Sequence, residues 1–360
     1  MFSTHPEPTP DTIDATGAGP AGSGAQPSTG LPPVARRGNS ARLWRIRHSA
    51  SKYSLLGVWL LMAVFFSAIE PHTFFRLSTA HTVFSSQSAL VFLSMALVVT
   101  FVVGEFDLSV ASVLGLAATL VPVLVVLHGV NIVLAIVITL AACVLIGCVN
   151  GTLIVHFNVN PIVVTLGMST FLLGLALQLS NLNTVTGLSA DTAQISNYPI
   201  VGLPVSFYTG LVLCLGLAYL LRFTPLGRHM LFVGSSREVA HLAGIRVNRI
   251  RFGAYVAAAL ISGIGGVILV AGLGGFDPSA SATYLLPSLS ALFLGTSVFQ
   301  PGRFNPLGSL VAVYFLVTGI VGLEIIGLSG WISDVFYGAA LVIAVTLSTV
   351  VRGRHHVVIR

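Results

Sequence analysis

The sequence predicts an all-α polytopic membrane protein, and two observations lead to this fold class. The chain of 360 residues is 55% hydrophobic and only 8% charged, with a mean hydropathy of +0.94. A soluble domain has roughly 25% charged residues, so this chain could not cover a globular surface with polar groups. Its apolar residues also form continuous runs of spanning length, whereas the strands of a membrane β-barrel alternate apolar and polar residues.

The N-terminal segment, residues 1–51, differs from the rest of the chain. As far as Arg37 it is rich in Pro, Gly, Ser, Thr and Ala and has almost no large apolar side chains, so we expect it to be disordered. It lacks the apolar core of a cleavable signal peptide. Basic residues then precede the first apolar run and should keep this tail in the cytoplasm. They are Arg36, Arg37, Arg42, Arg45, Arg47 and Lys52.

About ten apolar segments follow within residues 52–351, each near the length of a spanning helix. We place them near 53–70, 83–103, 109–127, 132–155, 162–181, 207–222, 252–273, 285–300, 306–324 and 331–351. An even number puts the C-terminal tail, residues 352–360, on the same side as the N-terminus. All of the 17 basic residues except Arg76 then lie on the cytoplasmic side, as expected for a membrane protein.

The loop 222–251 is the most polar interior segment and divides the chain in two. It carries six of the 17 basic residues, all arginines, and one acid, Glu238. Because moving arginines across the bilayer is costly, this loop should stay in the cytoplasm. On the other side, the polar loop 181–207 has no basic residue. It could meet an extracytoplasmic partner or be a plain solvated loop.

A short helix is expected inside the loop 222–251. The run Ser235-Ser236-Arg237-Glu238 fits an S-x-x-E capping box, and Gly244 is a suitable stop. The helix would have about eight residues, with Val239, Leu242 and Ala243 on one face and Arg237 and His241 on the other. A helix this short is marginal in water, so its apolar face should dock on the membrane surface or in a groove of a cytoplasmic partner.

Two apolar stretches are interrupted by short charged segments that contain Gly or Pro, at 104–109 and 300–306. Paired broken helices point to a transport path between two internal repeats, although two tight cytoplasmic turns would give the same pattern. A two-half pseudo-symmetry would fit the first interpretation, but no convincing residue-level repeat accompanies it. The candidate residues for the path or the helix breaks are Gly104, Glu105, Asp107, Ser109, Gly302 and Arg303.

Glu105 and Asp107 could form a proton or cation relay, because carboxylates at membrane depth are costly and usually functional. A structural role competes for Asp107. Its carboxylate could cap the helix expected to begin at Leu108, with Gly104 supplying the turn. Glu105 has no such explanation and could sit at the water interface.

The chain lacks the motifs of common catalytic sites. Lys52 is its only lysine and follows no glycine loop, so a Walker phosphate-binding loop is excluded. Neither HExxH nor GxSxG occurs, and Cys143, Cys148 and Cys214 lie in apolar runs without zinc-type spacing. We therefore expect no enzymatic activity, no bound cofactor or metal and no nucleic-acid partner. Uphill transport would draw on an ion gradient or on another chain.

Three patches carry a family resemblance. They are GEFDLSVASVLGLAA at 104–118, NPIVVTLGMSTFLLGLAL at 160–177, and GSSREVAHLAGIRVNRIR at 234–251 followed by LGTSVFQPGRFNPLG at 294–308. In their order and spacing they resemble the membrane permease subunits of bacterial ABC importers for simple sugars, of the ribose, xylose and galactose type. The resemblance runs from about the second span to the last.

The resemblance implies a permease subunit that passes a monosaccharide or polyol by alternating access in the bacterial inner membrane. Its partners would be a second permease copy or paralogue, two cytoplasmic ATP-binding subunits that hold ATP and Mg, and an extracytoplasmic sugar-binding protein. The ATPase-coupling helix would comprise Ser235, Ser236, Arg237, Glu238, Val239, Leu242 and Gly244. The alternative, from a different class, is a stand-alone proton-coupled transporter that uses Glu105 and Asp107.

The sequence departs from the family pattern at four places. Glu105 stands where the family usually has Gly, Ser236 replaces the common Asn, and His241 replaces the usual Arg. Gln300-Pro301 replaces Gly-Gly in the second break. Because Ser can still cap a helix, we expect the coupling helix to persist. The departures leave open whether the permease pairs with itself or with a paralogue.

Overall fold

The structure is a computed structural model that describes residues 53–356, apart from 75, 77, 78, 80–82, 85, 86 and 329. The predicted N-terminal tail, residues 1–51, lies outside the described residues, as do residues 357–360 of the predicted C-terminal tail. The last helix continues into that tail as far as His356.

Each predicted apolar segment coincides with a helix. These helices are α2 (Ser54–Ile69), α5 (Ser88–Val102), α6 (Val110–Pro122) with its π-helical continuation (Val123–Leu127), α7 (Ile132–Val155), α8 (Pro161–Leu179), α10 (Val205–Phe223), α13 (Val247–Leu273), α14 (Leu285–Gly295), α15 (Pro306–Ile325) and α16 (Trp331–His356). Among the described residues, six of them are long and apolar enough to cross a membrane: α6 with its continuation, α7, α8, α10, α13 and α15. The chain is therefore a multi-pass helical membrane protein, and the count of ten spans stays a prediction.

Shorter elements connect these helices. They are α3 (Pro71–Phe74), α9 (Ala190–Asn197), α11 (Pro225–Ser235), α12 (Arg237–Leu242), a 3-10 helix (Pro278–Tyr284), and the two-residue strands β1 (Val185–Thr186), β2 (Pro199–Ile200), β3 (Leu203–Pro204) and β4 (Gly275–Phe276). Strand β1 pairs antiparallel with β4, and β2 pairs antiparallel with β3. Both pairs are too short to form a core, so they only fasten loops.

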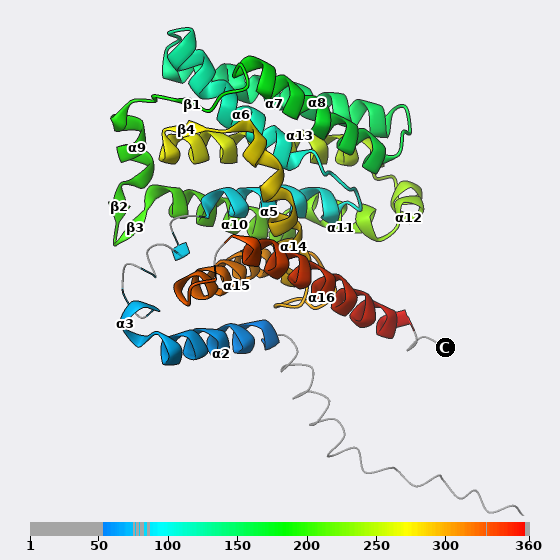
Figure 1. Ribbon diagram of the computed structural model, residues 1–360. Coiled ribbons are helices and arrows are strands. Elements are labelled where there is room, and N and C mark those ends of the chain that lie inside the picture. The colour runs from blue at the N-terminus through cyan, green and yellow to red at the C-terminus, as the bar shows by residue number, and fades with distance from the viewer. Residues whose placement is uncertain are drawn as a thin grey trace, which may run out of the picture. The chain divides into compact units, whose positions relative to one another are not determined.

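Helix α5 lies at the centre of the packing, and every one of its residues is buried. A helix that is apolar on all sides is expected in such a position. In Figure 1, α7 and α8 form an outer layer, α13 separates them from α5, and α14 and α15 lie on the other side of α5, in agreement with the contacts between these helices. The core that positions the site is thus built on α5 and α13.

Small residues allow α13 to approach its neighbours closely. A Cβ atom added to Gly266 of α13 would lie 2.3 Å from the carbonyl oxygen of Leu114 in α6, and one added to Gly147 of α7 would lie 2.8 Å from Cα of Val256 in α13. Such contacts leave no room for a side chain. They are typical of helices that pack within a membrane, where close backbone approach replaces the hydrophobic driving force.

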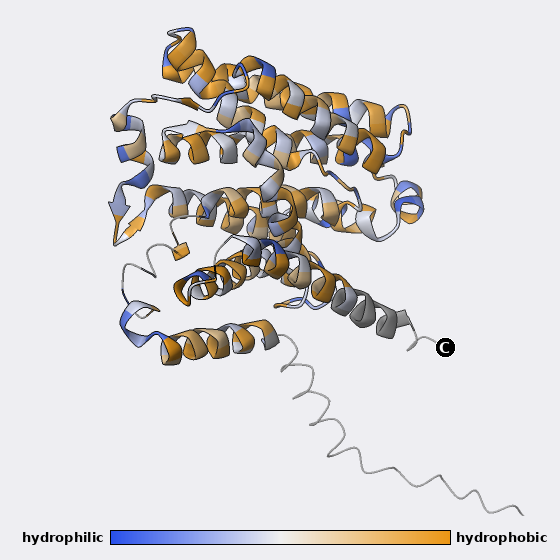
Figure 2. Ribbon diagram, in the orientation of Figure 1, coloured by the Kyte–Doolittle hydropathy of each residue, from blue (hydrophilic) through white to orange (hydrophobic). Residues whose placement is uncertain are grey.

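Apolar side chains are exposed along the outer helices, as expected for surfaces that face lipid. Leu60 of α2, Leu145 of α7, Val163 of α8 and Val212 of α10 are all largely exposed. Figure 2 shows hydrophobic residues along the helix bodies and hydrophilic residues gathered in connections, including α12. This distribution is inverted relative to a water-soluble protein, in which large exposed apolar surfaces are rare.

The loop predicted at 181–207 is folded rather than extended. It contains β1, α9 and the β2–β3 pair. Ser196 at the end of α9 donates a hydrogen bond of 3.5 Å to the carbonyl oxygen of Ile268, and Asn197 donates one of 3.2 Å to that of Gly272. The loop therefore packs against the end of α13, and contact with an extracytoplasmic partner stays a prediction.

Candidate functional site

The first predicted break is present and separates α5 from α6. Helix α5 ends at Val102 and α6 begins at Val110. Gly104 adopts a left-handed conformation with φ +78°, and Glu105 donates its backbone N–H to the carbonyl oxygen of Thr100 at 3.0 Å. A residue without a Cβ atom adopts this conformation without strain, so Gly104 turns the chain as predicted.

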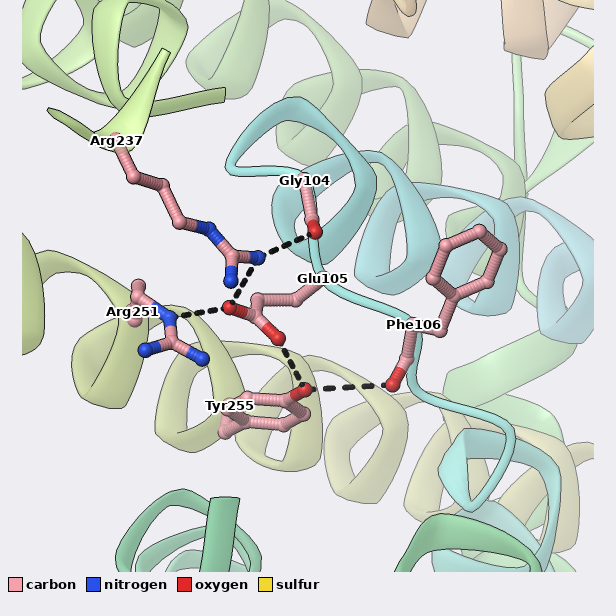
Figure 3. Close-up of polar contacts among 6 residues, drawn as sticks. All are labelled: Gly104, Glu105, Phe106, Arg237, Arg251 and Tyr255. Carbon is pink, nitrogen blue, oxygen red and sulfur yellow. Dashed lines mark hydrogen bonds and ion pairs between the residues drawn. The ribbon is translucent and has the colours of Figure 1, made fainter. Parts of the chain in front are cut away.

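Glu105 lies inside the protein and not at a water interface, which was one of the two positions considered from the sequence. Its side chain is 0% exposed and forms ion pairs with Arg237, at 2.8 Å, and with Arg251. The hydroxyl of Tyr255 donates a further hydrogen bond of 2.9 Å to its second carboxylate oxygen (Figure 3). A buried carboxylate is tolerated only when it is paired and hydrogen-bonded, and these three partners meet that condition.

Arg237 connects the short helix α12 to this break. It is the first residue of α12, and its Nη2 atom contacts both the carboxylate of Glu105 and the carbonyl oxygen of Gly104, each at 2.8 Å (Figure 3). The two groups of candidate residues predicted from the sequence, in the loop 222–251 and in the first break, therefore meet in one cluster.

Arg251 and Tyr255 complete the cluster and were not among the predicted site residues. They lie one turn apart on α13, so both side chains reach Glu105 from the same face. The hydroxyl oxygen of Tyr255 also lies 3.3 Å from the carbonyl oxygen of Phe106. The available signal was an arginine and a tyrosine four residues apart at the start of an apolar helix.

Helix α12 is shorter than predicted, and its cap is Ser236, which the family resemblance places at the helix start, rather than the first serine of the capping box. It has six residues, and the side chain of Ser236, not Ser235, accepts a hydrogen bond of 3.4 Å from the backbone N–H of Val239. Ser235 is instead the last residue of α11, because α11 and α12 follow each other with only Ser236 between them. The predicted stop is confirmed, since Gly244 has φ +79°.

Two apolar side chains are exposed on α12, among its polar residues. Ala240 is completely buried, whereas Val239 is 50% and Leu242 86% exposed. Helix α12 therefore packs on the protein through Ala240, and the predicted apolar face that contains Val239 and Leu242 points outward. Val239 and Leu242 lie three residues apart in α12, so they present a small apolar surface to the outside.

Helix α11 rests directly on the end of α5. A Cβ atom added to Gly234 would lie 2.0 Å from the carbonyl oxygen of Val102, and one added to Gly104 would lie 3.6 Å from Cα of Gly234. The backbones of α11 and α5 are thus in contact with no side chain between them. This contact holds α12, which follows α11, next to the break.

Asp107 stabilises the break but does not cap α6 in the predicted way. Its Oδ1 accepts hydrogen bonds from the backbone N–H of Ser109, at 3.0 Å, and from the Ser109 hydroxyl, at 2.6 Å. Helix α6 begins at Val110 rather than at Leu108, so the carboxylate binds the residue before the helix, not amides in its first turn. Asn150 donates a hydrogen bond of 3.0 Å to the Ser109 hydroxyl. Burial raises the pKa of the Asp107 carboxyl to about 6.

The second break spans 296–305 and is organised by Asn305. Its Oδ1 accepts the backbone N–H of Gly308 at 2.6 Å, and its Nδ2 lies within hydrogen-bond distance of the carbonyl oxygens of Gly295, Val298 and Arg303. The break begins earlier than predicted because α14 already ends at Gly295. Phe299 has φ +59°, a conformation that is rare for an aromatic residue.

The two breaks and α11 line one open cavity of about 710 Å³. Four of the six candidates for the path or the breaks line it: Gly104, Glu105, Gly302 and Arg303. Asp107 and Ser109 do not. Phe101 contacts three other phenylalanines of the lining in edge-to-face geometry, namely Phe106, Phe293 and Phe304. The remaining lining residues are Val102, Arg228, Leu231, Phe232, Gly234 and Ser235.

Comparison with known proteins gives a consistent result. The family described as "branched-chain amino acid transport system / permease component" matches residues 80–345. The autoinducer 2 import system permease protein LsrD of Salmonella typhimurium is 32% identical over 272 residues, which cover 73% of this chain and 81% of the relative. The ribose import permease protein RbsC of Bacillus subtilis is 33% identical over 252 residues, covering 69% and 78%. No solved structure matches the chain significantly.

Proposed function

The chain belongs to the family of branched-chain amino acid transport system permease components, and from this membership we propose that it is the permease subunit of an ATP-driven importer for a monosaccharide or polyol. The ribose import permease among its relatives supports this solute class over an amino acid. The alignments with the two import permeases cover 81% and 78% of those relatives' own lengths. They support an import permease and give no support to a stand-alone proton-coupled transporter.

One observation carries the proposed coupling mechanism, namely the contact of Arg237 with Gly104 and Glu105. An ATP-binding subunit would dock on the exposed Val239 and Leu242 of α12. When the ATPase changes conformation, α12 would move with it, and Arg237 would carry this movement to the break between α5 and α6. Sub-ångström shifts can be amplified in this way when the packed element has two arrangements.

The two arginines of the cluster would have different roles. The Arg251 side chain is 10% exposed, whereas the Arg237 side chain is 45% exposed. If α12 moved away, Glu105 would lose Arg237 but keep Arg251 and Tyr255, so its carboxylate would stay paired inside the protein. Arg237 is therefore the exchangeable contact, and Arg251 and Tyr255 anchor the break to α13. Two charge partners also make Glu105 a poor proton relay.

The arginine content of the loop 222–251 supports a topology in which α11, α12 and both chain termini face the cytoplasm of a bacterial inner membrane. All ten apolar helices would then cross or enter the bilayer. The cavity between the two breaks would lie at the cytoplasmic end of the translocation path. The segment with α9 would face the opposite side.

The remaining partners follow from the proposed subunit role. Two cytoplasmic ATP-binding subunits would hold ATP and Mg, because this chain has no phosphate-binding loop of the Walker type. A second permease copy or a paralogue would complete the channel through the exposed apolar helices. An extracytoplasmic sugar-binding protein would deliver the solute to the side that carries α9.

Reconstitution tests this proposal directly. Liposomes that contain the permease, its ATP-binding subunit and the sugar-binding protein should accumulate radiolabelled sugar when ATP is supplied to the side that carries α12. Omission of the ATP-binding subunit should abolish uptake. Accumulation driven by a proton gradient with the permease alone would overturn the proposal.

A further inference from the structure

The cavity between the two breaks carries an excess of positive charge. Its ionisable lining residues are Glu105, Arg228 and Arg303. The charge of Glu105 is already more than balanced by Arg237 and Arg251. Within the part of the chain that the structure describes, every ion pair involves Glu105, so neither Arg228 nor Arg303 is neutralised. An anion that enters the cavity would therefore meet two uncompensated guanidinium groups.

The two arginines reach the cavity from different elements. Arg228 lies in the first half of α11, and Arg303 lies in the second break, two residues before Asn305. Both side chains are exposed, so they can adjust to a ligand without breaking internal contacts. Guanidinium groups bind phosphate through paired, charge-assisted hydrogen bonds, which makes arginine the preferred residue for this group.

The rest of the lining suits the apolar faces of a small organic molecule. Phe101, Phe106, Phe293 and Phe304 form an aromatic cluster on the wall, and Phe232 lines the cavity from α11. The C–H faces of a sugar ring pack well on aromatic rings, and a volume of about 710 Å³ is in the range of small-molecule sites. An inorganic anion alone would leave the aromatic wall unused.

We propose that this cavity binds a phosphorylated monosaccharide, with Arg228 and Arg303 as ligands of the phosphate and the phenylalanine cluster against the sugar. This inference rests on the proposed function, because a separate kinase that transfers the γ-phosphoryl group of ATP onto a hydroxyl of the imported sugar, with release of ADP and a proton, would generate such a compound inside the cell. A ligand that contacts both α11 and the second break would hold these elements together. Accumulation of the sugar phosphate would therefore slow import by blocking the conformational change of the translocation path.

Binding can be measured without transport, so its outcome is independent of the proposed import function. The purified permease, in nanodiscs of phosphatidylcholine, is titrated with ribose 5-phosphate, with ribose and with inorganic phosphate. Ribose 5-phosphate should bind most tightly, inorganic phosphate more weakly, and ribose least. Because the arginine–phosphate contact is electrostatic, added salt should weaken the binding. Absence of ribose 5-phosphate binding, or equal binding of ribose, would overturn the proposal.

Variants locate the site. Arg228→Gln and Arg303→Gln should each weaken ribose 5-phosphate binding by about tenfold, the effect of losing one charge-assisted contact. Arg249→Gln is the matched control, because Arg249 is exposed on α13 and does not line the cavity. An equal loss in Arg249→Gln would show general charge attraction and contradict the site.

A phosphate group could also come from a lipid headgroup, and nanodiscs that contain phosphatidylglycerol distinguish the two sources. If the lipid occupies the cavity, ribose 5-phosphate binding should disappear in these nanodiscs, and Arg228→Gln and Arg303→Gln should release bound phosphatidylglycerol. That outcome would assign the cavity to lipid and refute the sugar phosphate. Arginine variants that bind ribose 5-phosphate normally but lose the ATP-binding subunit would also refute it.

Discussion

The carboxylate of Glu105 and the guanidinium of Arg237 form an ion pair of 2.8 Å between residues that lie 132 positions apart. One partner belongs to the break that follows α5, and the other begins α12. The pair therefore links α12, in which only Ala240 is buried, to the break that follows the fully buried α5. We infer that this link transmits the movement of an ATP-binding subunit, and the following predictions test its parts.

Arg237→Ala should uncouple ATP hydrolysis from uptake while leaving the protein in the membrane. The link to Gly104 and Glu105 is lost, but Arg251 and Tyr255 still pair with the buried carboxylate. ATP-dependent sugar uptake in the reconstituted system should fall about tenfold or more, with little change in basal ATP hydrolysis. Arg249→Ala, on the exposed side of α13, is the control that should transport normally.

Arg251→Gln should reduce stability more than Arg237→Gln. Removing the more buried cation leaves the carboxylate of Glu105 poorly compensated, at a cost of about 2 kcal/mol. The apparent melting temperature of the solubilised protein measures this loss. Glu105→Gln combined with Arg251→Gln should recover part of it, because neither charge is then left alone. A double variant no more stable than Arg251→Gln would contradict the pairing.

Asp107→Asn should retain most transport, because the amide oxygen of Asn can still accept both hydrogen bonds from Ser109. Asp107→Ala removes this acceptor and should lower both stability and uptake. Uptake by the two variants, normalised to the amount of protein in the membrane, distinguishes the roles. Complete loss of uptake in Asp107→Asn with normal insertion would indicate a proton relay instead.

Gly234→Ala should separate α11 from α5, since the added methyl group would lie 2.0 Å from the carbonyl oxygen of Val102. The displacement should weaken the contact of Arg237 with the break and reduce coupled uptake severalfold. Gly253→Ala is the matched control, because nothing lies within 4 Å of a Cβ atom at that position. Equal uptake by Gly234→Ala and Gly253→Ala would show that a displacement of α11 does not affect coupling.

Leu242→Glu should prevent association with the ATP-binding subunit. Leu242 is 86% exposed and makes little contact with its own chain, so the change should leave folding intact. Co-purification of the two subunits from detergent extracts measures the effect. Replacing His241, which is also exposed but lies on the other side of α12, with Glu should have a smaller effect. Normal co-purification of Leu242→Glu would show that the ATP-binding subunit docks on another surface.

The sequence predicts the helices well because continuous apolar runs identify segments that can be buried or face lipid. It also predicts the turn at Gly104 and the stop at Gly244, since each requires a conformation that favours glycine. The side of α12 that packs on the protein was not predictable, because it depends on a tertiary contact of Ala240.

The partners of Glu105 show more clearly what could not be predicted from the sequence. Its acidity within an apolar segment marked it as unusual, but Arg251 and Tyr255 lie about 150 residues further along the chain. A pattern over a few residues cannot show such pairing. Asp107 was misjudged for a related reason, because the apolar run begins at Leu108 while the helix begins only after the hydrogen-bonded Ser109.

The contact between Gly234 and Val102 has a mechanical consequence. Side chains at an interface can change rotamer and absorb a displacement, whereas two touching backbones have no such slack. A displacement of α11 would therefore be transmitted to α5 with little loss. The absence of two methyl groups at Gly104 and Gly234 thereby makes this junction stiff, although glycine is the residue usually associated with flexibility.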